Sequence, residues 1–277
     1  MIFVILLFAA LLYCGIYLVA NRFAYQPTRY PTGWWHMQAE LGAQDVWLCA
    51  RDGVRLHAWW LESPGSRCVT LYLHGNGDNL SVRPGHLREM IAAGSSVLIL
   101  DYRGYGKSAG WPTERGLYRD AEAGYDYLIS QGWRPGQIVL HGESLGAAVA
   151  VDLATRRRCA GLILECPITS ASDMAHKFVP VLGPLFVHGF NARRKIARVH
   201  AAVLIIHGDA DRMVPYAMGR ALFEAASEPK SFWTVEGARH LNIVEVAGPR
   251  YRERLREFYE SCLPDREVHN RHDHDGE

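Results

Sequence analysis

The pattern G-x-S-x-G, which holds the attacking serine of many acyl-transfer enzymes, occurs twice, at 106–110 and at 142–146. Such a serine needs a strand that enters the tight turn and a helix that leaves it, so that its hydroxyl stands above a sheet. Ser144 has both neighbours, because an apolar run precedes it and an alanine-rich segment follows it. Ser108 is soon followed by Pro112, which disfavours a helix there. We therefore expect Ser144 to be the nucleophile and Ser108 to be a loop residue.

An attacking serine also needs a base that takes its proton and an acid that holds this base in the right tautomer. His240 follows the last predicted strand, and Asp211 follows the strand before it. The chain order Ser144, Asp211, His240 is one that such triads use. Two other acids stay open at this point: Asp209, an ordinary turn residue, and Glu165, at the end of the preceding strand. We expect Asp211 to be the acid.

The charge that develops on the carbonyl oxygen needs two backbone N–H groups aimed at one point. We expect the first from Leu145, which directly follows the nucleophile. We expect the second from Asn76, in a glycine-rich loop, 74–79, at the end of an earlier strand. A turn that needs the dihedral freedom of glycine would have the same sequence, and both interpretations can hold.

A sheet must position these residues, and the chain carries the pattern of one. From about Asp45 onward, short β-rich runs alternate with helical stretches, which is typical of a mostly parallel sheet covered by helices on both faces. An antiparallel hairpin over 46–50 and 54–61, with Asp-Gly in its turn, forms one edge of the predicted sheet. The later predicted strands are near-continuous apolar runs, as buried strands should be: 69–73, 97–100, 138–140, 162–164, 203–206 and 232–235.

One predicted helix is recognised by its spacing. Leu117, Ala121, Tyr125 and Leu128 recur at i, i+4, i+8 and i+11 and form one apolar stripe, with Thr113 before them as the N-cap. We expect this stripe to pack on the sheet.

The C-terminal end divides into a helix and a tail. The helix is predicted over 250–262, with its apolar residues on one face. The polar segment 264–277 contains three histidines and too little apolar surface to fold, so we expect a disordered tail there.

Composition excludes several classes of protein. Of 277 residues, 49% are hydrophobic and 21% charged, so the chain can bury a core and is not mainly disordered. Thirty Lys and Arg against 29 Asp and Glu give a formal charge of +1, which argues against nucleic acid as a partner. The six cysteines lie far apart without a C-x-x-C pair, which favours buried thiols over a zinc site or a disulfide framework. Nothing in the sequence indicates an oligomeric state.

The segment 101–108 also imitates two nucleotide-binding motifs. Its end, Gly-Lys-Ser, matches a phosphate-binding loop, but Asp101 stands where that loop requires a glycine. A dinucleotide motif would have to open a helix, and this segment does not. Neither nucleotide motif is therefore expected to function, and the serine, base and acid considered above need no metal ion or cofactor.

The N-terminal end carries the membrane candidate of the sequence. Ile2 to Ala20 is a run of 19 residues without a charge, close to the length that a helix needs to cross a bilayer. No Lys or Arg precedes it and no good cleavage site ends it, which favours a retained anchor over a signal peptide. We therefore expect residues 1–24 to form a single-pass anchor, with Arg22 and Arg29 keeping the catalytic domain on the cytoplasmic side.

Five motifs in order give the sequence a more specific resemblance. They are H-G-N-G at 74–77, D-Y-R-G-Y-G-K-S at 101–108, G-E-S-L-G at 142–146, D-x-x-V-P at 211–215, and His240. Together they resemble the α/β-hydrolase superfamily, and most of all its Bem46-like and lysophospholipase-like branch of serine hydrolases with a short N-terminal membrane segment. The resemblance implies a triad of Ser144, His240 and Asp211, and it gives 101–108 a structural role.

The resemblance also implies a fold and a function. The expected fold is an α/β-hydrolase domain over 25–263, with about eight strands and a small cap at about 167–202. This cap is apolar enough to bind an acyl chain or simply to pack on the domain below it. The expected function is hydrolysis of a carboxylic ester or thioester of an acyl or lipid-like substrate, through an acyl-enzyme. A peptidase or amidase is the alternative among enzymes, and an inactive binding module of the same fold is the alternative outside them.

Overall fold

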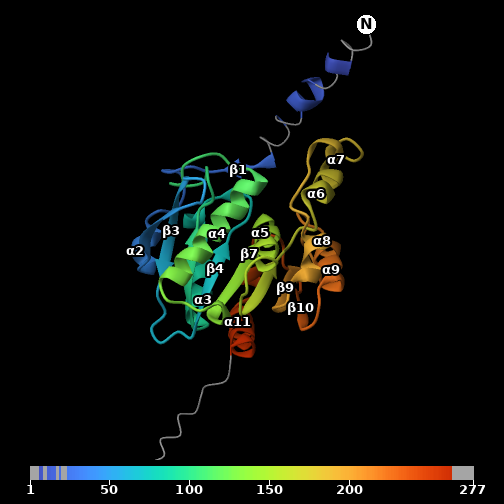
Figure 1. The fold of residues 1–277 in the computed structure, drawn as a ribbon. Coiled ribbons are helices and arrows are strands. Elements are labelled where there is room, and N and C mark those ends of the chain that lie inside the picture. Colours follow the sequence, from blue (N-terminus) through green and yellow to red (C-terminus); the bar gives the residue numbers. More distant parts are fainter. Residues whose placement is uncertain (1–5, 9–10, 17–18, 20–23, 264–277) are drawn as a thin grey trace, which may run out of the picture.

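The computed structural model describes residues 6–8, 11–16, 19 and 24–263 (Figure 1). An eight-stranded sheet has the order β10-β9-β8-β7-β4-β6-β3-β2. β3 is antiparallel to both of its neighbours, and the other neighbouring pairs are parallel. The strands are β2 (Gln44–Cys49), β3 (Arg55–Leu61), β4 (Cys68–Leu73), β6 (Ser95–Leu100), β7 (Ile138–Glu143), β8 (Gly161–Glu165), β9 (Ala202–Gly208) and β10 (Lys230–Val235). The predicted mostly parallel sheet is confirmed.

The predicted hairpin forms one edge of this sheet. Val46 of β2 pairs with Ala58 of β3 in antiparallel register. Gly53 in the connecting turn has a φ of +80°, in the left-handed region that glycine enters without strain. The hairpin is confirmed, with its strands shifted by one or two residues at their ends.

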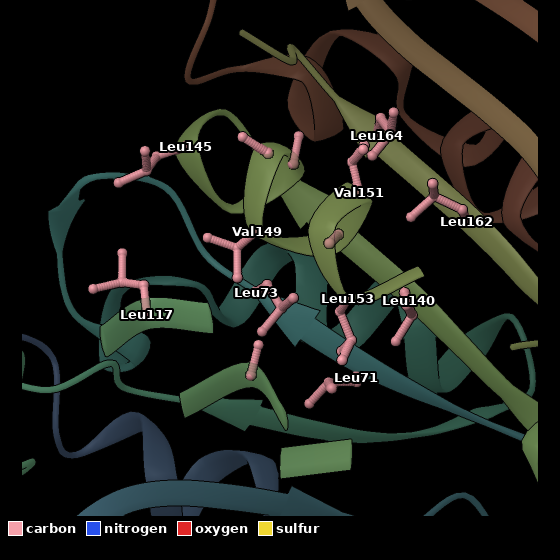
Figure 2. Close-up of a cluster of buried hydrophobic side chains, with 14 of the residues drawn as sticks. Leu71, Leu73, Leu117, Leu140, Leu145, Val149, Val151, Leu153, Leu162 and Leu164 are labelled. Atoms are coloured by element: carbon pink, nitrogen blue, oxygen red, sulfur yellow. The ribbon is translucent and has the colours of Figure 1, made fainter. Parts of the chain in front are cut away.

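Helices cover both faces of the sheet, and the core therefore has two halves (Figure 1). Successive residues of a strand face opposite sides. Leu71 and Leu73 of β4 lie in the half that contains the buried residues of α4 and α5, and Tyr72 lies in the half of α3 and α11. Figure 2 shows the first half, where leucines of β4, β7 and β8 cluster with Val149 and Leu153 of α5.

The helices connect the strands in chain order. They are α2 (Met37–Leu41), α3 (Pro84–Ala92), α4 (Glu114–Ser130), α5 (Leu145–Ala154), α6 (Ala171–Phe178), α7 (Gly183–Phe186), α8 (Ala192–Lys195), α9 (Tyr216–Ala225), α10 (Ile243–Ala247) and α11 (Pro249–Cys262), with short 3-10 helices at Leu80–Val82, Pro135–Gln137 and Ile196–Arg198. Both helices predicted from spacing are confirmed as α4 and α11. Thr113 caps α4, because its hydroxyl accepts the N–H of Gly116 at 3.1 Å.

Two further segments border the site described below. β1 (Gln26–Pro27) pairs with β5 (Gly77–Asp78) and so ties the start of the domain to the glycine-rich loop. A pairing of two residues is too short to leave a periodic signal in the sequence. The segment 167–202 contains α6, α7 and α8, and we call it the cap.

The anchor predicted over Ile2 to Ala20 is wrong. Of this run, residues 6–8, 11–16 and 19 are described. No helix in the described part of the chain is long and apolar enough to span a bilayer. This finding contradicts the expected single-pass topology and, with it, the membrane localisation, since a helix needs about 20 predominantly apolar residues to cross the hydrocarbon core. The tail predicted over 264–277 lies outside the described residues.

Candidate active site

The side chains expected to act together meet at one edge of the sheet. Ser144 follows β7, Asp211 lies shortly after β9, and His240 lies shortly after β10. The strands from β7 to β10 are parallel neighbours, so their carboxyl ends share this edge. The carboxyl edge is also where open α/β sheets bind their ligands.

Ser144 occupies a sharp turn between β7 and α5. Its φ is +54° and its ψ is −113°, a strained conformation for a residue with a side chain. The two glycines of the motif permit this turn because they lack a Cβ, which lets neighbouring backbone segments approach them closely. A Cβ on Gly142 would collide with the carbonyl oxygen of Gly146, and a Cβ on Gly146 would collide with that of Leu73. This geometry lifts the Ser144 side chain above the sheet, as a nucleophile elbow does.

His240 and Asp211 form a direct hydrogen bond. Nδ1 of His240 lies 2.7 Å from Oδ2 of Asp211. Because an ionised carboxylate can only accept hydrogen bonds, Nδ1 carries a proton, and in the neutral form of the ring the lone pair is therefore on Nε2. The imidazole is therefore in the tautomer that a general base needs.

Three groups hold the Asp211 carboxylate in place. Oδ1 accepts the N–H of Met213 at 2.8 Å and the N–H of Val214 at 2.9 Å, while His207 Nε2 lies 3.4 Å from Oδ2. Burial alone would raise the pKa of Asp211, but the interactions with His207 and His240 outweigh it and hold this pKa well below its usual range. Asp211 is consequently ionised at neutral pH.

Ser144 and His240 line one cavity of about 740 Å³. Asn76 and Leu145, whose N–H groups were expected to bind the oxyanion, line it as well. Asp211 is 8% exposed and lies behind His240, to which it is bonded. The structure thus gathers all five predicted site residues around one cavity.

The peptide between Gly75 and Asn76 has a fixed orientation. The ring of His74 donates from Nδ1 to the carbonyl oxygen of Gly75 at 2.8 Å. In a trans peptide the N–H points opposite to the C=O, so the N–H of Asn76 points away from this ring. Asp101 Oδ1 lies 3.4 Å from Nε2 on the other side of the same ring.

Two tyrosines of the segment 101–108 hold the glycine-rich loop. The hydroxyl of Tyr105 donates to the carbonyl oxygen of Asn76 at 2.9 Å. The hydroxyl of Tyr102 donates to the carbonyl oxygen of His74 at 3.1 Å. The segment 101–108 therefore acts on the site through the backbone of the loop.

Ser108, the other serine in a G-x-S-x-G pattern, is engaged in the fold. Its Oγ donates to the carbonyl oxygen of Asp101 at 2.7 Å and accepts the N–H of His57 at 2.8 Å. Gly106 is needed beside it, because its φ is +46° and a Cβ there would collide with the Asp101 carboxylate. This pentapeptide forms a packed loop instead of an elbow.

The two competing acids are bound elsewhere. Asp209 Oδ1 accepts the N–H of Gly237 at 2.7 Å, as a turn residue does. Glu165 accepts from the hydroxyl of Tyr251 at 2.6 Å and lies 2.8 Å from Nε2 of His86. In the described chain, Asp211 is the acid that His240 contacts.

A buried ion pair in the cavity wall was not expected from the sequence. Arg83 Nε donates to Glu143 Oε2 at 2.8 Å, and the hydroxyl of Tyr72 donates to the same oxygen at 2.7 Å. Burial alone would raise the pKa of Glu143, but Arg83 lowers it to about 2. The position of Glu143 next to the nucleophile was a signal that could have drawn attention to it. No such signal pointed to Arg83, because it is distant in sequence from Glu143.

The described residues include one cluster of metal-ligating types. Ligand atoms of Cys166, Asp211 and His240 all lie within 4.8 Å of one another. Cys166 directly follows β8, so it reaches the same edge of the sheet as the other two.

Comparisons of the sequence identify relatives of this chain. A family model described as serine aminopeptidase, S33 matches residues 65–191. The α/β hydrolase domain-containing protein 17C of Xenopus tropicalis is 35% identical over 235 residues, which cover 83% of this chain and 74% of the relative. The α/β hydrolase domain-containing protein 17B of Homo sapiens is 37% identical over 201 residues, which cover 71% of this chain and 67% of the relative. An uncharacterized protein of Mycobacterium tuberculosis is 38% identical over 78% of both chains.

Solved structures share the fold. An esterase of Pyrococcus furiosus aligns with a TM-score of 0.73 and 21% identity over 87% of this chain and 98% of its own. An α/β hydrolase of Penicillium aligns with a TM-score of 0.68 and 17% identity over 80% of this chain and 99% of its own. Likeness at these identities shows the fold alone. The family follows from the sequence relatives, which are at least 35% identical and matched over two thirds or more of their length. They show that the chain belongs to the α/β-hydrolase superfamily of hydrolytic enzymes.

Proposed function

We propose that this hydrolase is a serine hydrolase that cleaves carboxylic ester or thioester bonds through an acyl-enzyme on Ser144. His240 is the general base, and Asp211 holds its tautomer. The observation that carries the proposal is the 2.7 Å hydrogen bond between His240 and Asp211 beside a cavity that His240 shares with Ser144. The chemistry of these three side chains requires no metal ion or cofactor.

The reaction has two halves. In the first, Ser144 Oγ attacks the carbonyl carbon while Nε2 of His240 accepts the hydroxyl proton. The resulting imidazolium is stabilised by Asp211 and gives that proton to the departing alcohol or thiol, which leaves the acyl group on Ser144. In the second half, His240 takes a proton from water and the water oxygen attacks the acyl carbon. The imidazolium then returns that proton to Ser144 Oγ as the bond between Oγ and the acyl carbon breaks, and the acid is released.

The oxyanion is bound by the N–H groups of Leu145 and Asn76. Leu145 is the first residue of α5, and the first N–H groups of a helix have no partner within it. The helix dipole adds partial positive charge at the same place. The fixed Gly75–Asn76 peptide supplies the second donor without reorganisation during the reaction.

The cavity favours an acyl or lipid-like small molecule as the substrate. Its cap side carries apolar side chains that include Met174, Phe178 and Val187, while Arg83 and Glu143 line another part of it. Its volume of about 740 Å³ is within the usual range of small-molecule sites. We infer that the acyl chain lies against the cap and that the leaving group lies toward the ion pair.

We also propose a narrower family and a domain boundary. The H-G-N-G and D-Y-R-G-Y-G-K-S motifs support the Bem46-like and lysophospholipase-like branch of serine hydrolases. The hydrolase domain would extend over 25–263 and include the cap. The N-terminal anchor of that branch is not part of this proposal.

Cleavage of amides is a second candidate function, because the matching family model is described as a serine aminopeptidase. One acyl group presented as an oxygen ester, a thioester and an amide distinguishes the two functions by kcat/KM. We expect the ester and the thioester to be cleaved and the amide to be cleaved far more slowly. An amide cleaved as fast as the ester would favour the peptidase function.

Trapping of the acyl-enzyme tests the proposal itself. With a short 4-nitrophenyl ester, we expect a burst of nitrophenol and an acyl mass on the peptide that contains Ser144. Ser144→Ala should show neither, and Ser108→Ala should show both. A folded wild-type chain that gives neither the burst nor the adduct would indicate an inactive binding module.

A further inference from the structure

Cys166 is a thiol beside the candidate triad that the proposed reaction does not use. It is fully buried, directly follows β8 and lies within 4.8 Å of ligand atoms of both Asp211 and His240. β8 is separated from β10 by β9 alone, so the three residues come from the ends of three adjacent strands. The topology of the sheet therefore places a thiol, a carboxylate and an imidazole together.

The backbone holds Cys166 in a fixed and strained position. Its φ is +43°, in the left-handed region that residues with a side chain rarely adopt. Its N–H donates to the carbonyl oxygen of Ile206 in β9 at 2.8 Å, which anchors it to the neighbouring strand. Such a conformation persists only where its surroundings fix it, so the fold holds the backbone that carries the thiol in place.

The charges around Cys166 favour a cation. The carboxylate of Asp211 lies within 4.8 Å of the thiol, so a divalent ion bound between them meets a negative group and neutralises the thiolate as it binds. Thiolate, imidazole and carboxylate are the ligands that Zn²⁺ takes in proteins.

We propose that Cys166, Asp211 and His240 form a site for Zn²⁺ or a softer divalent cation such as Cd²⁺. A tetrahedral ion with bonds of about 2.0–2.3 Å keeps its ligand atoms roughly 3.3–3.8 Å apart. This separation lies between the 2.7 Å of the His240–Asp211 hydrogen bond and the 4.8 Å within which all three ligand atoms lie.

Metal binding at this site would turn the hydrolase off, an effect that rests on the proposed function. The ion replaces the proton between Nδ1 of His240 and Asp211, and that proton moves to Nε2. The thiol of Cys166 releases its own proton to solvent, so one proton is set free for each ion bound. With Nε2 protonated, His240 cannot accept the proton of Ser144. The site would make hydrolysis sensitive to free zinc.

Cadmium tests the site directly, because a cadmium–thiolate bond has an ultraviolet charge-transfer absorbance that does not depend on turnover. The full chain, freed of metal by a chelator, is titrated with Cd²⁺ alongside Cys166→Ala and the matched control Cys68→Ala, which removes a buried thiol of β4. We expect the tightest binding phase in the wild type and in the control. It should be absent from Cys166→Ala, while the more exposed thiols give the same background in all three.

Inhibition gives a second readout. Zn²⁺ should slow the reaction of the wild type with a fluorophosphonate probe, and a chelator should restore it. Cys166→Ala should need at least about tenfold more Zn²⁺ for the same effect, since even the loss of a group that supports a ligand costs about 10–100-fold in affinity. Thermal unfolding checks that the variant folds, and Cys166→Ser, which keeps the size of the side chain, replaces it if it does not.

The outcomes separate the metal site from the proposed function. Ser144→Ala removes no ligand and should bind Cd²⁺ as the wild type does. A chain that binds Cd²⁺ through Cys166 but never reacts with the probe would contradict the hydrolase function and support the site. Equal cadmium spectra in the wild type and in a folded Cys166 variant would overturn the site.

Discussion

The two oxygens of Asp211 have different partners. Oδ1 accepts the backbone N–H groups of Met213 and Val214, and Oδ2 faces Nδ1 of His240. The backbone bonds fix the carboxylate, and the fixed carboxylate then fixes the ring. An amide at this position could keep the shape but would present a donor to a ring nitrogen that must also donate.

Asp211→Asn is therefore expected to lower kcat by about 10⁴-fold, the size of loss known when a triad acid becomes an amide. Ester hydrolysis under saturating substrate measures it. Asp209→Asn is the matched control and should lower kcat much less, because Asp209 holds a turn at Gly237. A larger loss in Glu165→Gln than in Asp211→Asn would assign the acid to β8 and contradict the triad proposed above.

The ion pair of Arg83 and Glu143 predicts a dependence of stability on pH. Glu143 has a folded-state pKa of about 2, below its ordinary value of 4.5. A depressed pKa stabilises the fold above the unfolded-state value, so this stabilisation is complete above about pH 4.5. It is lost as the pH falls from there toward about 2.

Glu143→Gln leaves Arg83 buried without a counter-charge and should cost about 3–5 kcal/mol at neutral pH. Denaturant unfolding at several pH values measures the free energy of unfolding of the variant and the wild type. We expect the difference in the free energy of unfolding between the wild type and Glu143→Gln to shrink below pH 4.5. The control Glu253→Gln, in an exposed pair with Arg250, should show little difference at any pH. A difference for Glu143→Gln that does not change with pH would contradict the ion pair.

At the scale of elements, the segment 101–108 and the loop 74–79 act as one unit. Tyr105 bonds the carbonyl oxygen of Asn76, and His74 bonds that of Gly75. The orientation of the Asn76 N–H thus depends on contacts outside the loop. Loss of one contact should loosen the oxyanion site without removing a catalytic group.

Tyr105→Phe is expected to lower kcat and to leave KM nearly unchanged, because the oxyanion exists only after substrate has bound. The loss should be smaller than the roughly 10²–10³-fold that follows complete removal of an oxyanion donor. Tyr125→Phe is a matched control, since it removes a hydroxyl bond to the carbonyl oxygen of Arg158. It should leave both constants unchanged. Equal effects of the two variants would show that Tyr105 has no special relation to the site.

Elements with a hydrophobic period could be predicted from the sequence. The hairpin, the buried strands and the stripe of α4 follow from residues that alternate or recur every turn. The pairing of β1 with β5 could not, because two residues have no period. The prediction of a membrane span over Ile2 to Ala20 was wrong, since hydropathy measures the polarity of a segment and does not by itself establish a spanning helix.

At the scale of the whole molecule, the site is made by strand order. β7, β9 and β10 bring Ser144, Asp211 and His240 to one edge, although these residues are far apart in sequence. The sequence could suggest this set, because each member follows a recognisable strand. It could not reveal Arg83 against Glu143 or Cys166 beside Asp211, since those contacts depend on how elements pack.

The proposed function requires that the fold activate Ser144 as a nucleophile. Labelling by a fluorophosphonate probe tests it most directly, because the probe reacts with an activated serine and needs no knowledge of the substrate. We predict that the wild type and Ser108→Ala are labelled, that Ser144→Ala is folded but unlabelled, and that the modified peptide contains Ser144. Labelling of Ser144→Ala at the wild-type rate, or a folded wild type that stays unlabelled, would contradict the proposed role of Ser144.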